Sequence, residues 1–187
     1  MTRSFRAQHL DPSVIEKCLD LAARSPSAGK TQGWQVVGLV NEDTSTYWEA
    51  AMDSSVRRDF SFPGLFNASF VGVVLADPQA YVSRYSESDK AHTGLGSGPD
   101  AWSTPYWTVD AAMATMTFLH AVHDAGLGAL FFAVANEDRV RTALGIPDKL
   151  QVIGAVAVGF PGGDERRGRS AARPRRTAGD IIRWVRR

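Results

Sequence analysis

Apolar residues recur along the chain at spacings that predict helices in some stretches and strands in others. The first apolar stretch follows Asp11 and Pro12, which suit the N-cap and the first position of a helix. This helix is expected to end near Arg24, because the residue before Pro26 disfavours helical geometry. Its apolar face consists of residues at helical spacing: Val14, Ile15, Cys18, Leu19 and Ala22.

Later apolar runs are expected to form strands over residues 34–40, 68–76, 127–133 and 150–160, and the run 68–76 is rich in β-branched residues. Further helices are expected over residues 43–58, over residues 109–125 with Gly126 as the C-cap, and over a short stretch that Asn136 caps and Gly145 ends. Because nothing repeats and no low-complexity linker divides the chain, residues 1–187 are expected to form a single domain.

Residues 77–109 fit neither the helical nor the strand spacing of apolar residues. A connection of this length inside a compact domain is usually functional or partly helical, so we expect a functional loop or short helices here. The segment carries glycines and prolines among several aromatic residues: Tyr81, Tyr85, Trp102, Tyr106 and Trp107.

Composition narrows the class of protein. Of the 187 residues, 44% are hydrophobic and 22% are charged, as in a globular protein with a sizeable core. No apolar run approaches the ~20 residues that span a bilayer, and the first residues lack the apolar region of a signal peptide. A single cysteine, Cys18, cannot form an internal disulfide. We therefore expect a cytoplasmic protein with no membrane partner.

Charge is spread unevenly, although the net charge is only +1. Residues 164–187 hold nine Arg against three acidic residues, which makes this stretch +6 and the rest of the chain −5. A basic tail can bind nucleic acid, bind an anionic ligand or extend into solvent. Because the body has no basic surplus, we expect no general nucleic-acid binding. A non-catalytic binder that uses the tail stays an alternative.

Residues 27–31, Ser-Ala-Gly-Lys-Thr, end like a nucleotide-binding P-loop. A P-loop has Gly five positions before its Gly-Lys pair, and this chain has Arg24 there. A P-loop also joins a strand to a helix, so that the helix N-terminus meets phosphate. Here a predicted helix precedes the motif and a predicted strand follows it, so we do not expect a P-loop.

Other familiar sites are not indicated, and no metal site is expected. His120 and His123 stand beside Asp124 without a clear further ligand. Cys18 lies on an apolar helix face, and no Gly-x-Ser-x-Gly elbow occurs. The glycines within residues 94–98 follow no predicted strand, which argues against a dinucleotide fingerprint.

Three clusters remain: Arg3, Ser4 and Arg6; the loop 27–34; and Arg173, Arg175 and Arg176. Arg forks and Ser hydroxyls suit phosphate. These clusters belong to a series of motifs that resembles the nitroreductase superfamily of FMN enzymes over nearly the whole chain. The motifs are Thr-Arg-Ser-Phe-Arg at 2–6, Pro-Ser-Ala-Gly-Lys-Thr-Gln-Gly-Trp at 26–34, Asp-Ala-Gly-Leu-Gly at 124–128, Leu-Gly-Ile-Pro at 144–147, Gly-Phe-Pro at 159–161 and Arg-Pro-Arg-Arg at 173–176.

The resemblance implies an α+β fold of three layers: a central, mainly antiparallel sheet flanked by helices, with the C-terminal segment exchanged in a homodimer. It implies FMN at the dimer interface. The FMN phosphate would be held by Arg3, Ser4, Arg173 and Arg175, with Arg6 nearby. The rest of the flavin would be lined by Ser27, Ala28, Lys30 and Gln32, from the partner subunit, and by Phe131, Phe132, Ala133 and Val134.

The function implied by the resemblance is ping-pong hydride transfer from NADPH or NADH to a nitroaromatic, quinone or similar flat acceptor. The chemistry would be carried by the flavin, without a catalytic side chain. Residues 85–107 would form the substrate side of the pocket. Alternatives on the same flavin are oxidative dehydrogenation in natural-product biosynthesis, dehalogenation and flavin fragmentation. The sequence departs from the family pattern at Thr2, Lys30 and Gly33, where Arg, Asn and Pro are usual.

Overall fold

Strand β3 (Phe70–Ala76) forms the centre of the structure, and every one of its residues is buried. The computed structural model describes residues 1–163 and 168–185. β3 pairs on one side with β2 (Trp34–Val40) and on the other with β5 (Gln151–Pro161). The far edge of β5 pairs with two shorter strands, β1 (Phe5–Arg6) and β4 (Gly128–Phe132), and each of these pairings is antiparallel.

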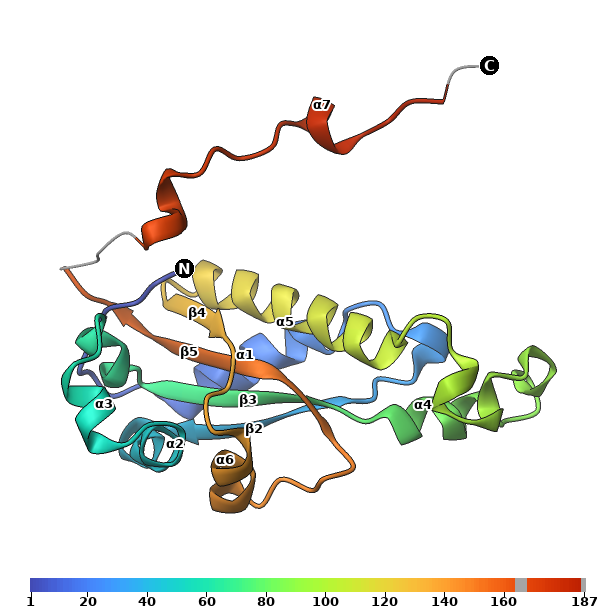
Figure 1. The fold of residues 1–187 in the computed structure, drawn as a ribbon, viewed down its shortest axis with the longest axis horizontal. Helices are drawn as coiled ribbons and strands as arrows, with labels where there is room; N and C mark the ends of the chain where they lie inside the picture. The colour runs from blue at the N-terminus through green and yellow to red at the C-terminus, as the bar shows by residue number, and fades with distance from the viewer. Residues whose placement is uncertain (164–167, 186–187) are drawn as a thin grey trace.

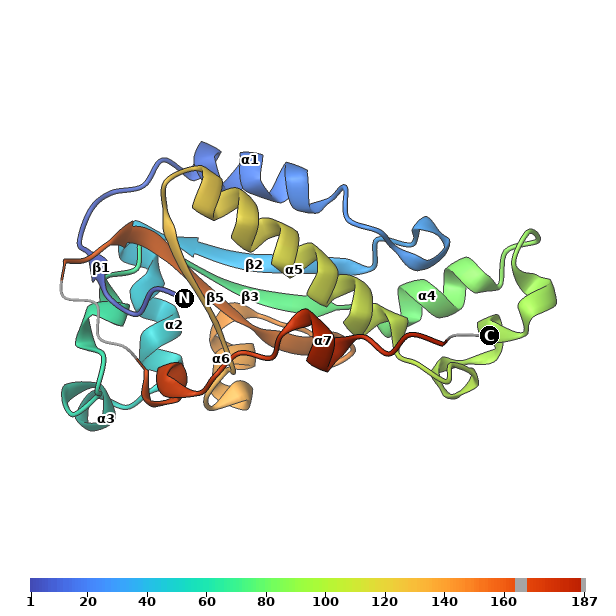
Figure 2. The same ribbon diagram turned by 90° about the horizontal axis from the view of Figure 1, so that it is seen from above.

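Helices cover both faces of this sheet (Figures 1 and 2). Helices α2 (Thr44–Ala51) and α6 (Glu137–Leu144) enclose one core, into which Val71, Val73 and Leu75 point. Helices α1 (Pro12–Ala22) and α5 (Tyr106–Asp124) enclose the other, which receives Phe70 and Val74. Alternate residues of β3 thus enter different cores, which is why the strand is apolar at every position. The predicted α+β arrangement is confirmed.

The ends of two helices lie where the sequence predicts. Asp11 accepts a hydrogen bond of 2.9 Å from the Ser13 backbone N–H at the start of α1, and this bond holds the pKa of its carboxyl below the usual range. Gly126, with φ of 77°, follows α5, and Leu127 then donates its N–H to the Val122 carbonyl at 3.1 Å.

The prediction of one helix over residues 43–58 is wrong. α2 ends at Ala51, Met52 is extended, and a separate helix α3 (Ser54–Arg58) follows. Asn136 stands at the N-cap of α6 as predicted, and its carbonyl accepts the Val140 N–H at 3.1 Å, but its side chain makes no capping hydrogen bond to that helix. Its φ is 48°, and its side-chain amide donates a hydrogen bond of 2.8 Å to the Ala51 carbonyl. The Asn136 side chain therefore satisfies the C-terminal end of α2.

Residues 77–109 are partly helical, as expected. Asp77 caps α4 (Pro78–Tyr85) by accepting a hydrogen bond of 3.0 Å from the Gln79 backbone N–H. Short 3-10 turns follow at Ala91–Thr93, Leu95–Ser97 and Pro99–Ala101, and α5 begins at Tyr106. This segment forms the end of the molecule beyond the sheet (Figure 1).

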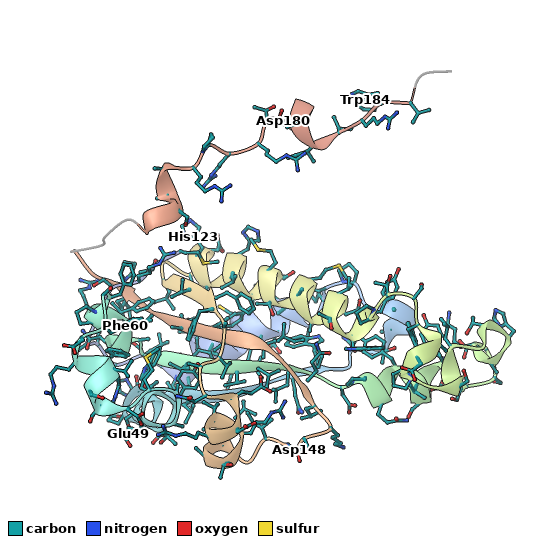
Figure 3. All side chains as sticks on the ribbon, in the orientation of Figure 1. Glu49, Phe60, His123, Asp148, Asp180 and Trp184 are labelled. Carbon is teal, nitrogen blue, oxygen red and sulfur yellow. The ribbon has the colours of Figure 1, made fainter. Side chains whose placement is uncertain are left out.

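The C-terminal segment extends past the body of the protein. It contains a 3-10 turn at Arg169–Ala172 and the short helix α7 (Ala178–Ile181), stands apart in Figure 1 and lies over α5 in Figure 2. Trp184 is 73% exposed and Val185 is 88% exposed, and Figure 3 shows Trp184 far from the body of the protein. Across the described residues, none of the helices has the length and apolar character needed to cross a membrane.

Candidate functional site

The N-terminal residues are fixed beside the open edge of the sheet. Thr2 donates its backbone N–H to the Ala129 carbonyl at 2.8 Å, and Gly162 donates its N–H to the Ser4 carbonyl at 2.8 Å. Ser4 is buried, whereas Arg6 in β1 is exposed. The predicted Arg3, Ser4 and Arg6 cluster therefore lies where β1, β4 and β5 come together.

Two close approaches define the surroundings of this cluster. The Arg3 guanidinium lies 5.7 Å from the centre of the Phe62 ring. A Cβ atom added at Gly168 would lie 3.4 Å from the Arg3 Cζ, so the backbone of Gly168 packs against the guanidinium. A Cβ atom at Gly64 would overlap the Ser4 hydroxyl, so this approach requires glycine. Residues 3 and 168, distant in sequence, are neighbours in space.

The C-terminal arginines begin just beyond this contact. Arg173 stands five residues after Gly168, and both Arg173 and Arg175 are exposed. No hydrogen bond or ion pair joins either of these two side chains to the rest of the described chain. The two ends of the chain therefore carry guanidinium groups and a hydroxyl that suit a phosphate, and the C-terminal segment contacts Arg3 at Gly168.

The loop between α1 and β2 holds an uncommon backbone. Gly29, Lys30 and Gln32 have φ angles of 61°, 55° and 53°. This left-handed conformation costs a residue with a side chain about 1–2 kcal/mol, so the loop needs support. Part of this support comes from Gln32, whose backbone N–H donates to Ser27 Oγ at 2.8 Å and whose Nε2 donates to the Ala23 carbonyl at 2.8 Å.

A buried carboxylate lies beneath this loop. Asp110, on α5, is 1% exposed, and its Oδ2 accepts hydrogen bonds of 2.7 Å from the Ala28 backbone N–H and from the Tyr81 hydroxyl. Its Oδ1 is buried and has no hydrogen-bond partner within residues 1–163 and 168–185. Burial raises the pKa of Tyr81, and the hydrogen bond to Asp110 raises it further. Tyr81 therefore stays protonated as a donor.

Helix α4 adds a second set of contacts to the loop. Arg84 Nε donates a hydrogen bond of 2.9 Å to the Gly29 carbonyl. Its guanidinium is held in turn by Asp89, at 2.7 and 2.8 Å, and by Glu87 at 3.1 Å. A Cβ atom at Gly29 would lie 2.9 Å from Cε2 of Tyr85, so the loop rests on that ring. The 77–110 region is thus a support for the 27–32 loop.

Asp110, Tyr81 and Arg84 are site residues that the sequence analysis missed. One signal was present for Asp110. It follows Trp107 by three residues and precedes Ala111 and Ala114, and all of these lie on the buried face of α5. A carboxylate at such a position is costly unless it has donors, so it marks a buried polar network. Nothing local in the sequence indicated that Arg84 would reach Gly29.

A cavity of about 330 Å³ adjoins the loop. Ala28 contributes to one wall, and Tyr85, Trp102 and Tyr106 contribute to the other. The Trp102 ring centre lies 4.6 Å from that of Tyr85 and 6.0 Å from that of Tyr106. Aromatic walls of this kind suit a flat, largely apolar molecule. Lys30, two residues after Ala28, is exposed.

The side chains of Phe131 and Phe132 are used in packing. The Phe131 ring belongs to the core beneath α1 and α5, and it lies where a Cβ atom at Gly154 would be only 2.6 Å away. The Phe132 ring belongs to the opposite core and stacks on Trp48, with ring centres 5.8 Å apart. Both side chains are half-buried, and each ring contributes to a core.

The backbone of β4, by contrast, faces the open edge of the sheet. The Ala129 carbonyl accepts the Thr2 N–H, so the backbone groups of Ala129 point away from β5. Alternate residues of a strand share this direction, so the N–H of Phe131 points to the same edge. Ala133 is exposed and Val134 is half-buried just beyond the strand. The edge can offer a ligand backbone donors.

The phosphate-type cluster and the loop lie at opposite ends of the sheet. Trp34 pairs with Ala76 at one end, whereas Arg6 pairs with Phe160 at the other. Between them β3 alone spans about 20 Å at ~3.3 Å per residue. Figure 1 shows the N-terminus and the loop that enters β2 on different sides of the molecule. One chain therefore does not bring these two predicted clusters together.

Two exclusions made from the sequence agree with the structure. The turn at Gly29 and Lys30 is followed by β2 and not by a helix, so it is not a P-loop. Cys18 is buried in the core, and burial raises the pKa of its thiol, which disfavours the nucleophilic thiolate. In the part of the chain that the structure describes, no His, Cys, Asp and Glu side chains form a group of three or more that could hold a metal ion.

The antiparallel sheet with helices on both of its faces defines an α+β protein. The family model described as "Nitroreductase family" matches residues 1–160. The chain belongs to the Nitroreductase family, and the resemblance stated from its motifs is confirmed.

Curated relatives carry oxidoreductase names. A protein of Archaeoglobus fulgidus named as an NADH dehydrogenase/NAD(P)H nitroreductase is 28% identical over 166 residues, which cover 85% of this chain and 79% of the relative. An NADPH-dependent oxidoreductase of Staphylococcus aureus is 23% identical over 182 residues, 92% of this chain. This chain spans 64% of that longer protein.

Solved structures share the fold. A nitroreductase-like protein from Streptococcus mutans superposes with a TM-score of 0.78 at 17% identity, covering 99% of this chain and 93% of the other. An FMN-dependent nitroreductase from Clostridium difficile R20291 superposes with a TM-score of 0.62 at 18% identity, covering 89% of this chain and 84% of the other. The nitroreductase fold predicted from the motifs is confirmed.

Proposed function

We propose that the protein is an FMN-dependent oxidoreductase that takes reducing equivalents from NADPH or NADH and passes them to a nitroaromatic, quinone or similar flat acceptor. The observation that supports this proposal is the packing of Gly168 against Arg3, because the segment that carries Arg173 and Arg175 then starts beside the N-terminal arginine of a Nitroreductase-family chain. The names of the relatives, which include NADPH-dependent and FMN-dependent enzymes, support the same reading.

The residues present fit the phosphate of FMN. Arg3 and the exposed Arg173 and Arg175 supply guanidinium donors, Ser4 supplies a hydroxyl, and Arg6 adds a nearby positive charge. The flavin ring system would meet the 27–32 loop, with Ser27, Ala28, Lys30 and Gln32, and the backbone of residues 131–134. When bound, FMN supplies the two-electron redox chemistry, and the chain supplies binding, orientation and exclusion of water.

A second copy of the chain would complete the site. The arginine cluster and the loop lie at opposite ends of one sheet, so a homodimer can present one chain's arginines beside its partner's loop. The C-terminal segment offers the apolar surface that such a dimer needs, since Ile181, Ile182, Trp184 and Val185 are exposed. The outer face of α5 adds Met116, which is 49% exposed.

The aromatic cavity is the proposed acceptor side of the site. It shares Ala28 with the loop, so a molecule between Trp102 and Ala28 would lie next to the residues that line the flavin. Flat aromatic or quinone-like molecules match its walls. The same cavity would also accept the substrate of a specialised reaction, such as dehydrogenation or dehalogenation. Assays with different acceptors distinguish a specialised reaction from the general reduction of nitroaromatics and quinones.

An absorbance spectrum of the purified protein tests the proposal, followed by anaerobic titration with NADPH and NADH. We expect flavin bands that bleach when one of the nicotinamides is added. A colourless protein that does not bind added FMN contradicts the proposal. Bleaching by a nicotinamide without turnover of simple nitroaromatics or quinones favours a specialised acceptor.

A further inference from the structure

The 27–32 loop depends on groups outside itself. Within the loop, Lys30 donates its N–H to the Ser27 carbonyl at 2.9 Å, and Thr31 donates to the Ala28 carbonyl at 3.1 Å. Turn hydrogen bonds of this kind also form around right-handed residues, so they do not select a positive φ at both Lys30 and Gln32. A backbone in a sparsely populated region persists only where its surroundings fix it, and such regions cluster at functional sites.

Asp110 is the buried charged group that contacts the loop directly. Its Oδ2 accepts the Ala28 N–H, and a hydrogen bond to an ionised acceptor in a low-dielectric interior is stronger than one between neutral groups. The fully buried Tyr81 donates to the same oxygen and so fixes the carboxylate on α5 against α4. Arg84 holds the next carbonyl, that of Gly29, from the outer side.

An apolar residue at position 110 would fill the same space without removing a carboxylate from water. The chain instead carries Asp there, with Oδ1 lacking a partner among the residues described. This unfavourable placement occurs beneath a left-handed loop, and Ala28 of that loop also lines the aromatic cavity. A buried, incompletely satisfied polar group at such a place calls for a functional reason.

We infer that Asp110 is a positioning residue: its carboxylate, held in place by Tyr81, fixes the 27–32 loop in the conformation that receives the flavin, and Arg84 holds the same loop separately through the Gly29 carbonyl. This inference rests on the proposed function. It assigns the 77–110 region a role besides lining the acceptor cavity, because that region shapes the cofactor side of the site. Asp110 acts through Ala28 and does not itself touch the flavin.

The first test follows the loop without any cofactor. Lys30 is an exposed trypsin site, so the rate of cleavage after Lys30 in the full chain reports how tightly the loop is held. Losing one charged hydrogen bond should raise this rate about tenfold or more in Asp110→Ala. Asp110→Asn keeps an acceptor oxygen and should raise it less than about threefold. Tyr81→Phe should fall between the two, because the Ala28 hydrogen bond stays.

The matched control is Thr115→Val. Thr115 is buried on the same helix, and its hydroxyl donates a hydrogen bond of 2.7 Å to the Ala111 carbonyl within α5. This variant removes a buried polar group without touching the loop, so we expect no change in cleavage after Lys30. An unchanged rate in Asp110→Ala overturns the inference.

The second test measures the affinity for FMN by fluorescence titration of the same variants. We expect the dissociation constant to rise about tenfold in Asp110→Ala and to recover largely in Asp110→Asn. Faster cleavage after Lys30 with an unchanged FMN affinity overturns the positioning role. The role is also overturned if the FMN affinity falls in proportion to the loss of Tm in every variant, including Thr115→Val, because a general loss of stability would then explain it. If the wild-type protein binds no FMN, the proposed function and the flavin part of this inference are both overturned. The cleavage rates use no cofactor, so they still test whether Asp110 anchors the loop.

Discussion

Tyr81 occupies the space that a side chain at position 33 would need. A Cβ atom at Gly33 would lie 2.6 Å from Cε2 of Tyr81, whose ring is fully buried. The Nitroreductase-family motif that this stretch resembles usually has Pro at that position. The departure to Gly33 therefore follows from the Tyr81 ring, which here stands against the loop and donates to Asp110.

Replacing Gly33 by Ala should destabilise the protein. The new methyl group must displace the Tyr81 ring or the backbone, and overpacking of this kind costs about 1–3 kcal/mol. Urea unfolding measures the change in the free energy of unfolding. Gly163→Ala is the control, because nothing lies within 4 Å of its added Cβ atom. Equal stability of the two variants would contradict the packing described for Tyr81.

Replacing Arg3 by Gln should weaken FMN binding. The substitution removes the guanidinium that Gly168 packs against, and losing a charge-assisted hydrogen bond to phosphate should raise the dissociation constant about tenfold or more. Fluorescence titration with FMN measures this. Lys17→Gln removes one positive charge at an exposed position on α1, outside both predicted clusters, and it should leave the affinity nearly unchanged. A similar effect of both variants would point to a general effect of net charge.

Replacing Trp184 by Ser should weaken the proposed homodimer. An aromatic side chain that is 73% exposed in one chain is a strong candidate for a buried anchor in a dimer, and truncating such an anchor costs about 2 kcal/mol or more. Sedimentation equilibrium should show a dimer dissociation constant raised at least about tenfold. Arg183→Ser, next to it in the chain, is the control. Monomeric wild-type protein would refute the exchange of this segment.

Alkaline pH should destabilise the protein through its buried tyrosines. Burial raises the pKa of Tyr81 and of Tyr47 above the usual value, so the unfolded chain loses these protons first as pH rises. The stability they contribute is complete below pH ~10 and is lost as pH rises towards the folded pKa, by about 1.4 kcal/mol per pH unit for each group. Tyr81→Phe and Tyr47→Phe should each flatten the decline in urea-unfolding free energy.

The exposed Tyr106 provides the control for this pH series. Tyr106→Phe should leave the slope of stability against pH above 10 nearly unchanged, because it removes no buried phenol. Slopes that are identical in Tyr81→Phe and the wild type would show that Tyr81 ionises in the folded protein as readily as in the unfolded chain.

Replacing Trp102 by Ala should impair use of the acceptor more than binding of FMN. Trp102 forms the aromatic wall of the cavity with Tyr85 and Tyr106, and loss of a stacking surface costs about 0.5–1.5 kcal/mol beyond the lost area. Steady-state kinetics with a quinone should show KM for the acceptor raised about threefold to tenfold. An unchanged KM with a raised FMN dissociation constant would show that the acceptor does not bind in this cavity.

Local pattern predicted the elements that are stabilised by their own sequence. β3 is apolar at every position because helices cover both of its faces, and α1 has its cap, its proline and its apolar face in adjacent residues. The motifs around Ser4, Ser27 and Arg173 indicated the family. These features are contained in short stretches, so reading the sequence alone was sufficient.

The features that were missed depend on contacts between distant residues. Asn136 was assigned to α6 from its neighbours, but its side chain bonds to Ala51, 85 residues earlier. Asp110 meets Ala28 across 82 residues. The homogeneous helical pattern of residues 43–58 gave no sign that Met52 would be extended. The packing of the whole chain decides which distant groups come into contact, so local spacing in the sequence cannot predict these contacts.

The placement of Arg3 and Asp110 at opposite ends of the chain's sheet has a genetic consequence. In a homodimer whose sites each combine one chain's arginines with the other chain's loop, an Arg3→Gln chain paired with an Asp110→Ala chain forms one site with both defects and one site with neither. Two alleles that each weaken FMN binding would then complement each other when expressed together. Half of the wild-type activity per mixed dimer is the expected ceiling, and a chain carrying both substitutions could restore none with either single variant.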